Sequence, residues 1–359
     1  FPSITNISYP ASYQKFLSAI NVVNLNLGSI ISASCLFEGI NFYHRLLFVT
    51  LSPIALVTML MVTYGFARRS LKHRDSETSR EDLNSTFSRH VAFGLLLTFL
   101  VFSSVSTTVF QTFACERFEE LGAWYLRADY SIMCDTQEYS LYKTYAGIMI
   151  LVYPIGIPLL YFAVLWKQRE KLDPKPDNTI LEGAAPGGSA EDISQRALWQ
   201  RKKQKEQMTE WELKERVRMR GQDPDLTPTL FLWKDFGPNL YYYEVIECGR
   251  RILLTGTLIF IEPQSAAQAA MACIFAFLSL LGFELLRPHL DTGDSWLYRL
   301  GCIIIFFSNF LGLLIKVDVS EEGNVSQEVF GVLLVIVNIA LLFAIWGTTY
   351  FSAQQMMDD

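Results

Sequence analysis

The sequence predicts an all-α fold: a polytopic transmembrane helix bundle with seven spans, the N-terminus outside, the C-terminus inside and an amphipathic helix on the outer interface. Three observations predict this fold. Several apolar stretches have about 20 residues, the length that a helix needs to cross a hydrocarbon core of roughly 30 Å. Basic residues gather in alternate connections between these stretches, and two glycosylation sequons fall on the opposite side.

The cleanly apolar stretches are residues 45–66, 91–113, 144–166, 265–286, 296–315 and 329–351. A weaker candidate, residues 241–261, carries Glu244, Glu247, Arg250 and Arg251 in its first half and is apolar only over its second half. Counting it gives seven spans, so the two termini are expected on opposite sides of the membrane.

Positive charge predicts the orientation of the bundle. With the N-terminus outside, the cytoplasmic connections hold most of the 30 Lys and Arg residues, as the positive-inside bias requires. Those in the short connection after the first span carry the most weight: Arg68, Arg69, Lys72 and Arg74. The basic residues left outside or at outer boundaries are Lys15, Arg45, Arg117, Arg127, Lys143 and Lys316.

Sequons agree with this orientation. Asn6 and Asn324 begin Asn-X-Ser/Thr sequences that fall outside, so both are predicted glycosylation sites. Asn84 begins a third such sequence, which falls inside, where it would not be glycosylated. A sugar on Asn84 would overturn the orientation.

Three of the cysteines are expected outside. Cys115 and Cys134 share one outer loop, where an oxidising compartment favours a disulfide worth roughly 3 kcal/mol. The competing arrangement joins Cys35 to one of these two sulfurs.

Residues 16–36 form the predicted interfacial helix. Phe16, Ile20, Val23 and Leu27 recur at intervals of three and four residues, with asparagine and serine on the other face. Such a helix lies on the outer interface. The alternative is an eighth span, which would move the Asn6 sequon inside.

The start of the chain indicates a missing domain. It begins Phe1-Pro2, with neither a methionine nor the apolar region of a signal peptide, although this end must be translocated. We therefore expect an extracellular domain upstream, with this chain as the C-terminal membrane module of a longer protein.

A cytoplasmic insert, residues 167–240, separates the third and fourth spans. The Gly-rich run 183–189 indicates a flexible linker, and a charged helix is expected at 191–220. Trp199 and Leu213 would be anchors if this helix were a calmodulin-type target. Its mixed charge and broken apolar stripe favour a solvated helix near anionic headgroups.

These elements divide the chain into five parts. They are an extracellular juxtamembrane segment (1–44), spans one to three with a disulfide loop at 114–140 (45–166), the insert (167–240), spans four to seven (241–351) and a cytoplasmic tail (352–359).

No catalytic constellation appears in the sequence. The four histidines flank spans without metal-ligand spacing, and neither a phosphate-binding loop nor a Gly-X-Ser-X-Gly motif occurs. We expect neither an enzyme nor a cofactor or metal site, and no nucleic-acid partner.

Polar and helix-breaking residues inside the spans are the candidate functional residues. Asn309 and Asn338 lie near the middles of the last two spans, where an amide needs a partner or a water path. Pro154 and Pro158 are expected to kink the third span. That kink is either a hinge or a static bend that lets a neighbour pack against Gly156.

A charged motif opens the fourth span. Glu247 precedes Arg250 and Arg251 by three and four residues, the spacing that pairs charges on one helix face. It is either a simple charged helix entry or a coupling between the insert and the bundle.

Three motifs together carry a family resemblance. They are the outer loop with Tyr-Leu-Arg-Ala-Asp-Tyr-Ser-Ile at 125–132, the helix Leu-Val-Tyr-Pro-Ile-Gly-Ile-Pro at 151–158, and the segment from Tyr243-Glu244 to Arg250-Arg251-Ile-Leu-Leu-Thr-Gly256. The chain resembles the C-terminal membrane module of large protist and algal surface proteins, a module similar to transient-receptor-potential (TRP) channel domains. The resemblance implies a cysteine-rich ectodomain with EGF-like or ephrin-receptor-like repeats.

The last six spans follow the topology of such a channel, but two features depart from it. The connection 317–328 is too short for a re-entrant pore helix and selectivity filter. The span at 265–286 lacks the spaced arginines of a voltage sensor. Acidic residues at the outer mouth favour cation conduction: Asp318, Glu321 and Glu322.

Three functions follow as hypotheses. The chain is a membrane anchor for an extracellular assembly, a TRP-like cation channel or mechanotransducer, or a seven-helix receptor as the third alternative. The expected partners are membrane lipids, extracellular structural or matrix proteins and, for a channel, further copies of the chain. The expected location is a plasma, ciliary or flagellar membrane.

Overall fold

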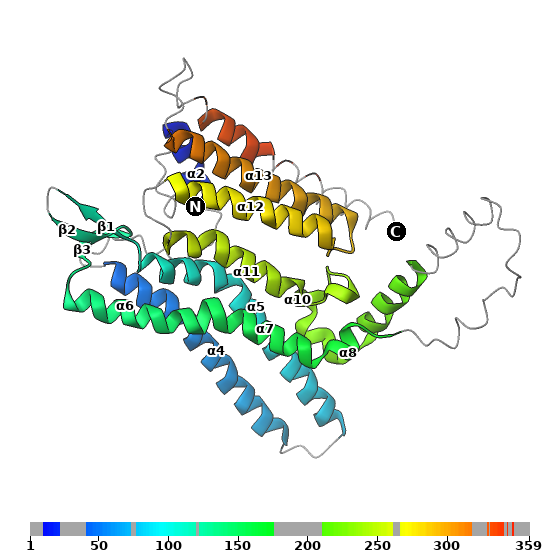
Figure 1. The fold of residues 1–359 in the computed structure, drawn as a ribbon. Helices are drawn as coiled ribbons and strands as arrows, with labels where there is room; N and C mark the ends of the chain where they lie inside the picture. Colours follow the sequence, from blue (N-terminus) through cyan, green and yellow to red (C-terminus); the bar gives the residue numbers. More distant parts are fainter. Residues whose placement is uncertain are drawn as a thin grey trace, which may run out of the picture.

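The structure is a computed structural model of the chain, and it describes residues 10–21, 41–72, 77–119, 122–175, 210–260, 266–317, 329, 331–340, 343 and 347. Over these residues it is predominantly helical (Figure 1). One end of the bundle carries a small sheet, and the other carries residues 210–240 of the insert. We call these the sheet end and the insert end.

Five helices have the length and hydropathy to cross a membrane: Phe42–Arg69, Ser85–Gln111, Gln137–Lys167, Ala266–Leu286 and Thr292–Ile315. They coincide with five of the predicted spans, so the expected multi-pass helical bundle is confirmed at this level. Their outward faces are apolar: Met59, Met61 and Phe66 are 64–67% exposed. In water such a surface would be unfavourable, whereas in a bilayer it faces hydrocarbon.

Helices α4 (Phe42–Lys72) and α5 (Glu77–Gln111) form an antiparallel hairpin. Threonine hydroxyls within it donate to carbonyls of the preceding turn, as Thr50 does to Leu46 (2.7 Å). Tyr153 Oη reaches across from the third span to the carbonyl of Thr50 (2.5 Å). These bonds satisfy polar groups that have no water partner at membrane depth.

The third span contains a π-helical turn where the sequence predicts a kink. Helix α6 (Gln137–Ile150) passes through the π turn Leu151–Ile155 into α7 (Gly156–Lys167). The wider turn accommodates Pro154, which has no backbone donor, and Pro158 lies in the first turn of α7, where a missing N–H is tolerated. A Cβ added at Gly156 would meet the Leu151 carbonyl oxygen at 2.9 Å. Gly156 therefore makes room for its own helix, and among the described residues a Cβ at this position would meet no atom of another helix within 4 Å.

The connection between α5 and α6, predicted as an outer loop, is a three-stranded antiparallel sheet, which the all-α prediction missed. Strands β1 (Cys115–Phe118), β2 (Ala123–Leu126) and β3 (Asp129–Met133) lie in that order. Cys115 pairs with Leu126 and Phe118 with Ala123. Gly122 turns between the first two strands with φ 62°, a conformation that glycine adopts without strain.

The predicted fourth span is shorter than expected. Helix α11 (Tyr243–Thr255) has 13 residues and is followed by a 3₁₀ turn at Thr257–Phe260. A Cβ on Gly256 would lie 2.3 Å from the Phe110 ring, so the glycine lets this end of α11 approach α5. The charged first half of α11 packs against protein, as shown below.

The N-terminal helix is α2 (Ala11–Asn21), five residues earlier than the predicted start at residue 16. The rest of the predicted interfacial helix lies outside the described residues. Tyr13 of α2 is buried with Leu311 and Ile315 of α13 (Thr292–Lys316) and with Leu334 of a helix at 331–340. Ala269 of α12 (Ala266–Leu286) completes this cluster. The final predicted span is described as a continuous helix only over 331–340.

At the insert end, short elements cover the helix termini. They are α8 (Arg169–Leu172), a helix over 210–222, the 3₁₀ turn η5 (Pro224–Thr229), α10 (Leu230–Trp233) and the 3₁₀ turn η6 (Pro238–Leu240). The helix at 210–222 overlaps the end of the charged helix expected at 191–220, whereas the Gly-rich run lies outside the described residues.

Candidate functional site: a charged clasp at the insert end

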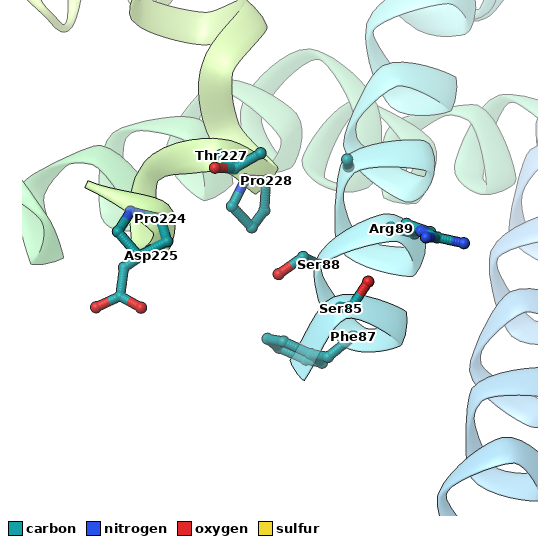
Figure 2. Close-up of a pocket in the computed structure, with 9 residues that line it drawn as sticks. Ser85, Phe87, Ser88, Arg89, Pro224, Asp225, Thr227 and Pro228 are labelled. Atoms are coloured by element: carbon teal, nitrogen blue, oxygen red, sulfur yellow. The ribbon is translucent and has the colours of Figure 1, made fainter. Parts of the chain in front are cut away.

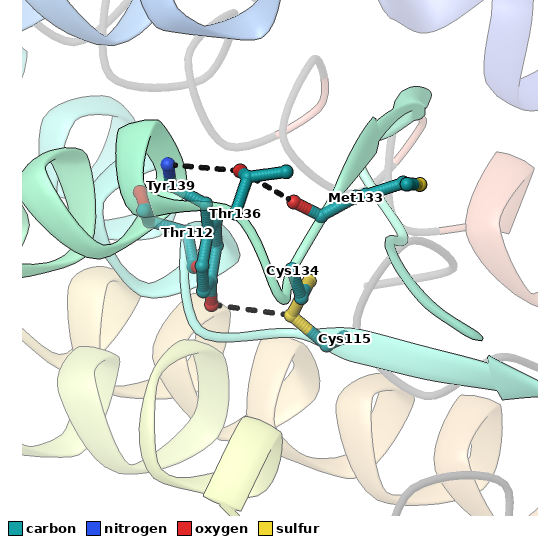
Figure 3. The surroundings of a disulfide bond; sticks show 6 residues. All are labelled: Thr112, Cys115, Met133, Cys134, Thr136 and Tyr139. Atoms are coloured by element: carbon teal, nitrogen blue, oxygen red, sulfur yellow. Dashed lines mark hydrogen bonds between the residues drawn. A yellow bond between two sulfur atoms is a disulfide. The ribbon is translucent and has the colours of Figure 1, made fainter.

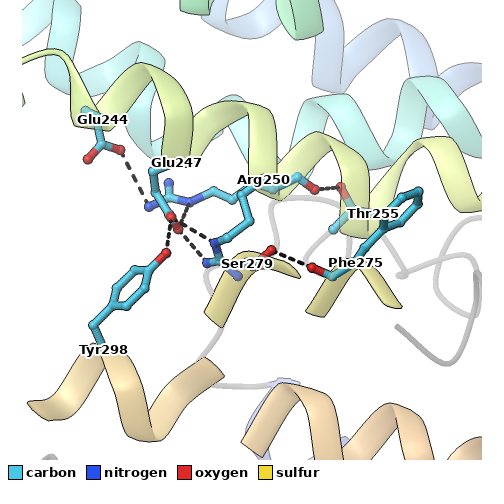
Figure 4. Close-up of polar contacts among 8 residues, drawn as sticks. Glu244, Glu247, Arg250, Thr255, Phe275, Ser279 and Tyr298 are labelled. Carbon is cyan, nitrogen blue, oxygen red and sulfur yellow. Dashed lines mark hydrogen bonds and ion pairs between the residues drawn. The ribbon is translucent and has the colours of Figure 1, made fainter. Parts of the chain in front are cut away.

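Buried charges from α11 meet a tyrosine of α13 at the insert end (Figure 4). Glu247 is 6% exposed and accepts four hydrogen bonds. They come from Arg250 Nε (2.8 Å) and Nη2 (2.5 Å), Arg251 Nε (3.3 Å) and Tyr298 Oη (2.7 Å). The ion pair predicted from the spacing is therefore present, and Tyr298 extends it to a second helix.

The two arginines contact different neighbours. The Arg250 guanidinium lies 5.5 Å from the ring centroid of Tyr298, and that of Arg251 lies 5.1 Å from the ring of Phe99 on α5. Both distances are those of cation–π contacts. The residues of α11 thereby connect α13 to α5.

A second carboxylate completes the charge balance. Glu244 is 7% exposed, and its Oε1 lies 3.6 Å from Arg251 Nη2. Two acidic and two basic side chains, with Tyr298, make up what we call the clasp: Glu244, Glu247, Arg250, Arg251 and Tyr298. Because its charges are mutually neutralised, removing one of the four charged members leaves another charge uncompensated, a change that typically costs several kcal/mol.

The connection between α12 and α13 is attached to the insert by backbone bonds. Gly237 N donates to the Pro288 carbonyl (2.8 Å), and Leu290 N donates to the Asp235 carbonyl (3.0 Å). Between them, Phe236 and His289 form an isolated antiparallel bridge. We call this pairing of 235–237 with 288–290 the clip.

His289 lies in an aromatic cage beside the clip. Its ring centroid is 5.1–6.4 Å from those of Phe236, Tyr243, Phe283 and Tyr298. Burial lowers the pKa of the His289 imidazole, although the carboxylates of Asp294 and Asp235 act in the opposite direction. The neutral ring therefore fits this cage better than the cation.

Arg220 links the helix at 210–222 to the clip. It is 1% exposed, its Nη2 donates to the Phe236 carbonyl (2.6 Å), and its guanidinium lies 4.8 Å from the Trp233 ring centroid. Burial, with the nearby charge of Arg216, lowers the pKa of Arg220 to about 10. At neutral pH it remains a cation that holds the end of the insert against the clip.

A disulfide joins Cys115 to Cys134 at the sheet end, with a Cα–Cα distance of 6.5 Å (Figure 3). This confirms the predicted pairing and excludes the alternative that joins Cys35 to either sulfur. Tyr139 Oη lies 3.1 Å from Cys115 Sγ and donates to the Thr112 carbonyl (3.0 Å). The bridge thus holds the sheet against the start of α6.

Asp129 fastens the sheet to α4. Its Oδ2 accepts a hydrogen bond from the Phe42 backbone N–H (3.0 Å), one of the free donors at the start of a helix. Burial alone would raise the pKa of Asp129, but hydrogen bonds from Ser131 and Phe42 outweigh it and lower the pKa below its usual value. The carboxylate therefore acts as an ionised cap for α4.

The two membrane asparagines bond within the bundle. Asn309 is 4% exposed and its Nδ2 donates to the Ile305 carbonyl one turn earlier (2.9 Å). Asn338 Nδ2 donates to the Leu334 carbonyl (2.8 Å) and lies 3.4 Å from Tyr13 Oη of α2. Asn338 therefore links the last helix to the N-terminal helix.

Other predicted residues lie outside the described part of the chain. These are Asp318, Glu321 and Glu322 of the expected outer mouth, the sequon residues Asn6 and Asn324, and Cys35.

Sequence reasoning missed the partners that come from distant segments. Tyr298 is 51 residues from Glu247, and Arg220 and His289 belong to separate connections. The charged half of α11 was the available signal, because buried charges require partners from a neighbouring helix. Nothing in the sequence specified which neighbour.

Comparison with protein-family models, with curated proteins and with solved structures finds no match to this chain. Among the described residues, no group of three or more His, Cys, Asp or Glu side chains is arranged to hold a metal ion. The clasp, the clip and the sheet end are the built features of this part of the chain.

Proposed function

We propose that this chain is a TRP-like membrane module of a large cell-surface protein, and that it anchors an extracellular assembly to the membrane. In this proposal it crosses the membrane seven times, with the sheet end outside and the insert end in the cytoplasm. Cation conduction or mechanotransduction by a homo-oligomer is the second candidate, and a seven-helix receptor is the third. The proposed location is a plasma, ciliary or flagellar membrane.

The direction of α11 supports the count of seven. Its first half joins Tyr298 at the insert end, and Gly256 lies against Phe110 near the sheet end. The preceding span ends at the insert end, and α12 begins at the sheet end. A segment must therefore cross from the insert end to the sheet end, and α11 with its 3₁₀ turn is the part of the chain that does so.

The chemistry of the two ends supports the orientation. The disulfide lies at the sheet end, which suits an oxidising compartment. Basic residues flank the helices at the insert end, as the positive-inside bias expects of the cytoplasmic side.

The anchor proposal rests on one observation, the burial of α2 against the last helices of the bundle. Tyr13 is 6% exposed among residues of α12, α13 and the helix at 331–340. A Cβ added at Gly331 would lie 2.7 Å from both Pro10 Cβ and Ser12 Oγ, so the two backbones are in close approach. A load arriving from the N-terminal side would pass through these contacts to the last two helices.

The asparagines favour the anchor over the channel. A pore needs polar groups that face a shared water path. Both amides instead donate to a carbonyl one turn earlier on their own helices, and Asn338 also lies 3.4 Å from Tyr13 Oη of α2, which supports a packing role.

Planar-bilayer recording of the purified protein tests this proposal, together with its oligomeric state in nanodiscs. We expect a monomer without single-channel current. A symmetric oligomer that conducts cations, with currents that Asn338→Leu abolishes while the protein stays folded, would replace the anchor by the channel.

A further inference from the structure

An apolar cavity of about 280 Å³ lies between α4, α5 and α7. It extends from Val57 and Thr98, near the middles of their spans, to Tyr64 and Phe87, near the insert end. Val57 and Tyr64 lie about 10 Å apart along the axis of α4. The cavity thus covers most of one leaflet, whose hydrocarbon is roughly 15 Å deep, and one of its ends lies near the headgroups.

The described residues that line this cavity include no Asp, Glu, Lys or Arg. Charged side chains lie instead in two neighbouring cavities of about 490 and 670 Å³, which both share Phe87 with the first. Figure 2 shows the larger of the two, with Arg89 and Asp225 among its side chains. The other cavity contains Lys167, Glu170, Lys171 and Asp225. We therefore expect a neutral occupant in the apolar cavity, where a charge would have no partner.

Two polar groups near the insert end of the cavity can still form hydrogen bonds. The Tyr64 hydroxyl has no hydrogen-bond partner among the described residues, and the Tyr64 ring centroid is 5.8 Å from that of His90. His90 Nδ1 lies 2.8 Å from the Thr86 carbonyl, so in the neutral ring Nδ1 carries the proton and Nε2 is an acceptor. Thr63 Oγ1 lies 3.4 Å from Nε2 but donates its hydrogen to the Leu60 carbonyl (2.9 Å). One ligand hydroxyl can therefore accept from Tyr64 and donate to His90.

The sequence of α4 has the spacing of a pattern proposed for cholesterol contact. Leu60, Tyr64 and Arg68 follow one another at intervals of four residues and match its order of Leu or Val, Tyr, and Lys or Arg. This pattern is short, and by itself it selects no ligand. Here, however, Leu60 and Tyr64 both line the cavity, and Arg68 follows on the same face of α4, one turn nearer the insert end. The sequence and the cavity thus indicate the same ligand class.

We propose that this cavity binds one sterol. The ring hydroxyl accepts from Tyr64 Oη and donates to His90 Nε2, and the alkyl tail points toward Val57 in the middle of the membrane. Gly94, which has no side chain, leaves a smooth wall for the flat face of the fused rings. A rigid ring body loses less conformational entropy on binding than a flexible acyl chain of similar size. The site does not depend on whether the module is an anchor or a channel.

Two substitutions test the two parts of this site. Gly94→Leu fills the space for the rings, and a Cβ at Gly94 meets nothing within 4 Å, so the first atom of the new side chain displaces no protein atom. Its matched control is Gly147→Leu on α6, which is equally open and does not line the cavity. Tyr64→Phe removes only the hydroxyl. Its control is Tyr142→Phe, at another half-buried tyrosine of a span that lies outside the cavity lining.

The measurement is equilibrium binding of tritiated cholesterol to the purified protein in detergent. We expect saturable binding of one cholesterol per chain, with unchanged affinity in the two control variants. Each buried methylene contributes about fourfold to affinity, so Gly94→Leu should weaken binding by about tenfold or more. Loss of one hydrogen bond in Tyr64→Phe should weaken it by about two- to tenfold. Epicholesterol, which differs only in the configuration at the hydroxyl, should displace the label less well than unlabelled cholesterol.

Three results would overturn the proposal. The first is the absence of saturable cholesterol binding by the unaltered protein. The second is equal affinity of Gly94→Leu and the unaltered protein when both elute as the same folded species. The third is displacement of the label by dioleoylglycerol or phosphatidylglycerol as effectively as by cholesterol, which would show that the cavity takes an acyl chain instead.

Discussion

Tyr298→Phe tests whether the clasp joins α11 to α13 as a unit. The substitution removes only the hydroxyl that donates to Glu247 Oε2 at 2.7 Å. The ring stays in place for Arg250, whose guanidinium lies 5.5 Å from its centroid. The perturbation therefore separates the hydrogen bond from the cation–π contact.

The expected loss is set by the kind of bond that is removed. A hydrogen bond to a charged group contributes about 1.5–3 kcal/mol. Glu247 keeps three donors from its two arginines, so the remaining carboxylate is still compensated. We therefore expect Tyr298→Phe to lower the free energy of unfolding by about 2 kcal/mol. Glu247→Gln, which leaves Glu244 as the one carboxylate of the clasp for two partly buried guanidinium groups, should cost about 3–5 kcal/mol.

Reversible unfolding in mixed detergent micelles measures both variants and their combination. Because the two side chains share one bond, the double variant should be less destabilised than the sum of the single ones by about 1 kcal/mol or more. Tyr242→Phe is the matched control next to α11 and should change stability by less than about 0.5 kcal/mol. Strict additivity of the two clasp variants would refute the reasoning, as would equal effects of Tyr298→Phe and Tyr242→Phe.

Three further predictions concern the disulfide, the cage and the close approach of α11. Replacing Cys115 and Cys134 together by serine should cost about 3 kcal/mol, since the bridge closes a loop with a sequence separation of 19; thermal unfolding without reductant measures this, and an unchanged midpoint would contradict it. The folded-state pKa of His289 lies below its unfolded value, so its contribution to stability is fully present above pH about 6.5 and is lost as pH falls from there through the lower folded-state pKa; His289→Phe should flatten the stability profile below pH about 6.5, and an identical profile would count against the buried neutral ring. Gly256→Ala should cost about 1–3 kcal/mol because its Cβ overlaps the Phe110 ring, and Phe110→Leu should recover part of that loss in the double variant; no recovery would place the strain elsewhere.

Much of the helical framework could be predicted from the sequence. A span needs about 20 apolar residues in one run, so its signal is local and strong. The pairing of Glu247 with Arg250 and Arg251 was also predictable, because residues three and four apart share one face of a helix. The disulfide followed from the compartment in which both cysteines were expected.

The features that were missed depend on distant parts of the chain. The sheet consists of strands of four or five residues, too short to show a clear alternation. The start of α2 was placed too late because its anchor, Tyr13, is recognisable only through its neighbours on α13 and at residues 331–340. Likewise, α11 appeared to be a weak span because its charged half does not specify which neighbouring helix will cover it.

Helix α13 is where the contacts of both ends converge. Its start is held by the clasp through Tyr298, and the connection before it is held by the clip through Pro288 and Leu290. Its other end is covered by α2 through Leu311 and Ile315. A displacement of α13 along its axis would have to disturb buried charges at one end and a buried apolar cluster at the other. Since these contacts cannot all be kept while the helix slides, a load on the N-terminal side should be resisted at the insert end as well, which is the mechanical property that the proposed anchor needs.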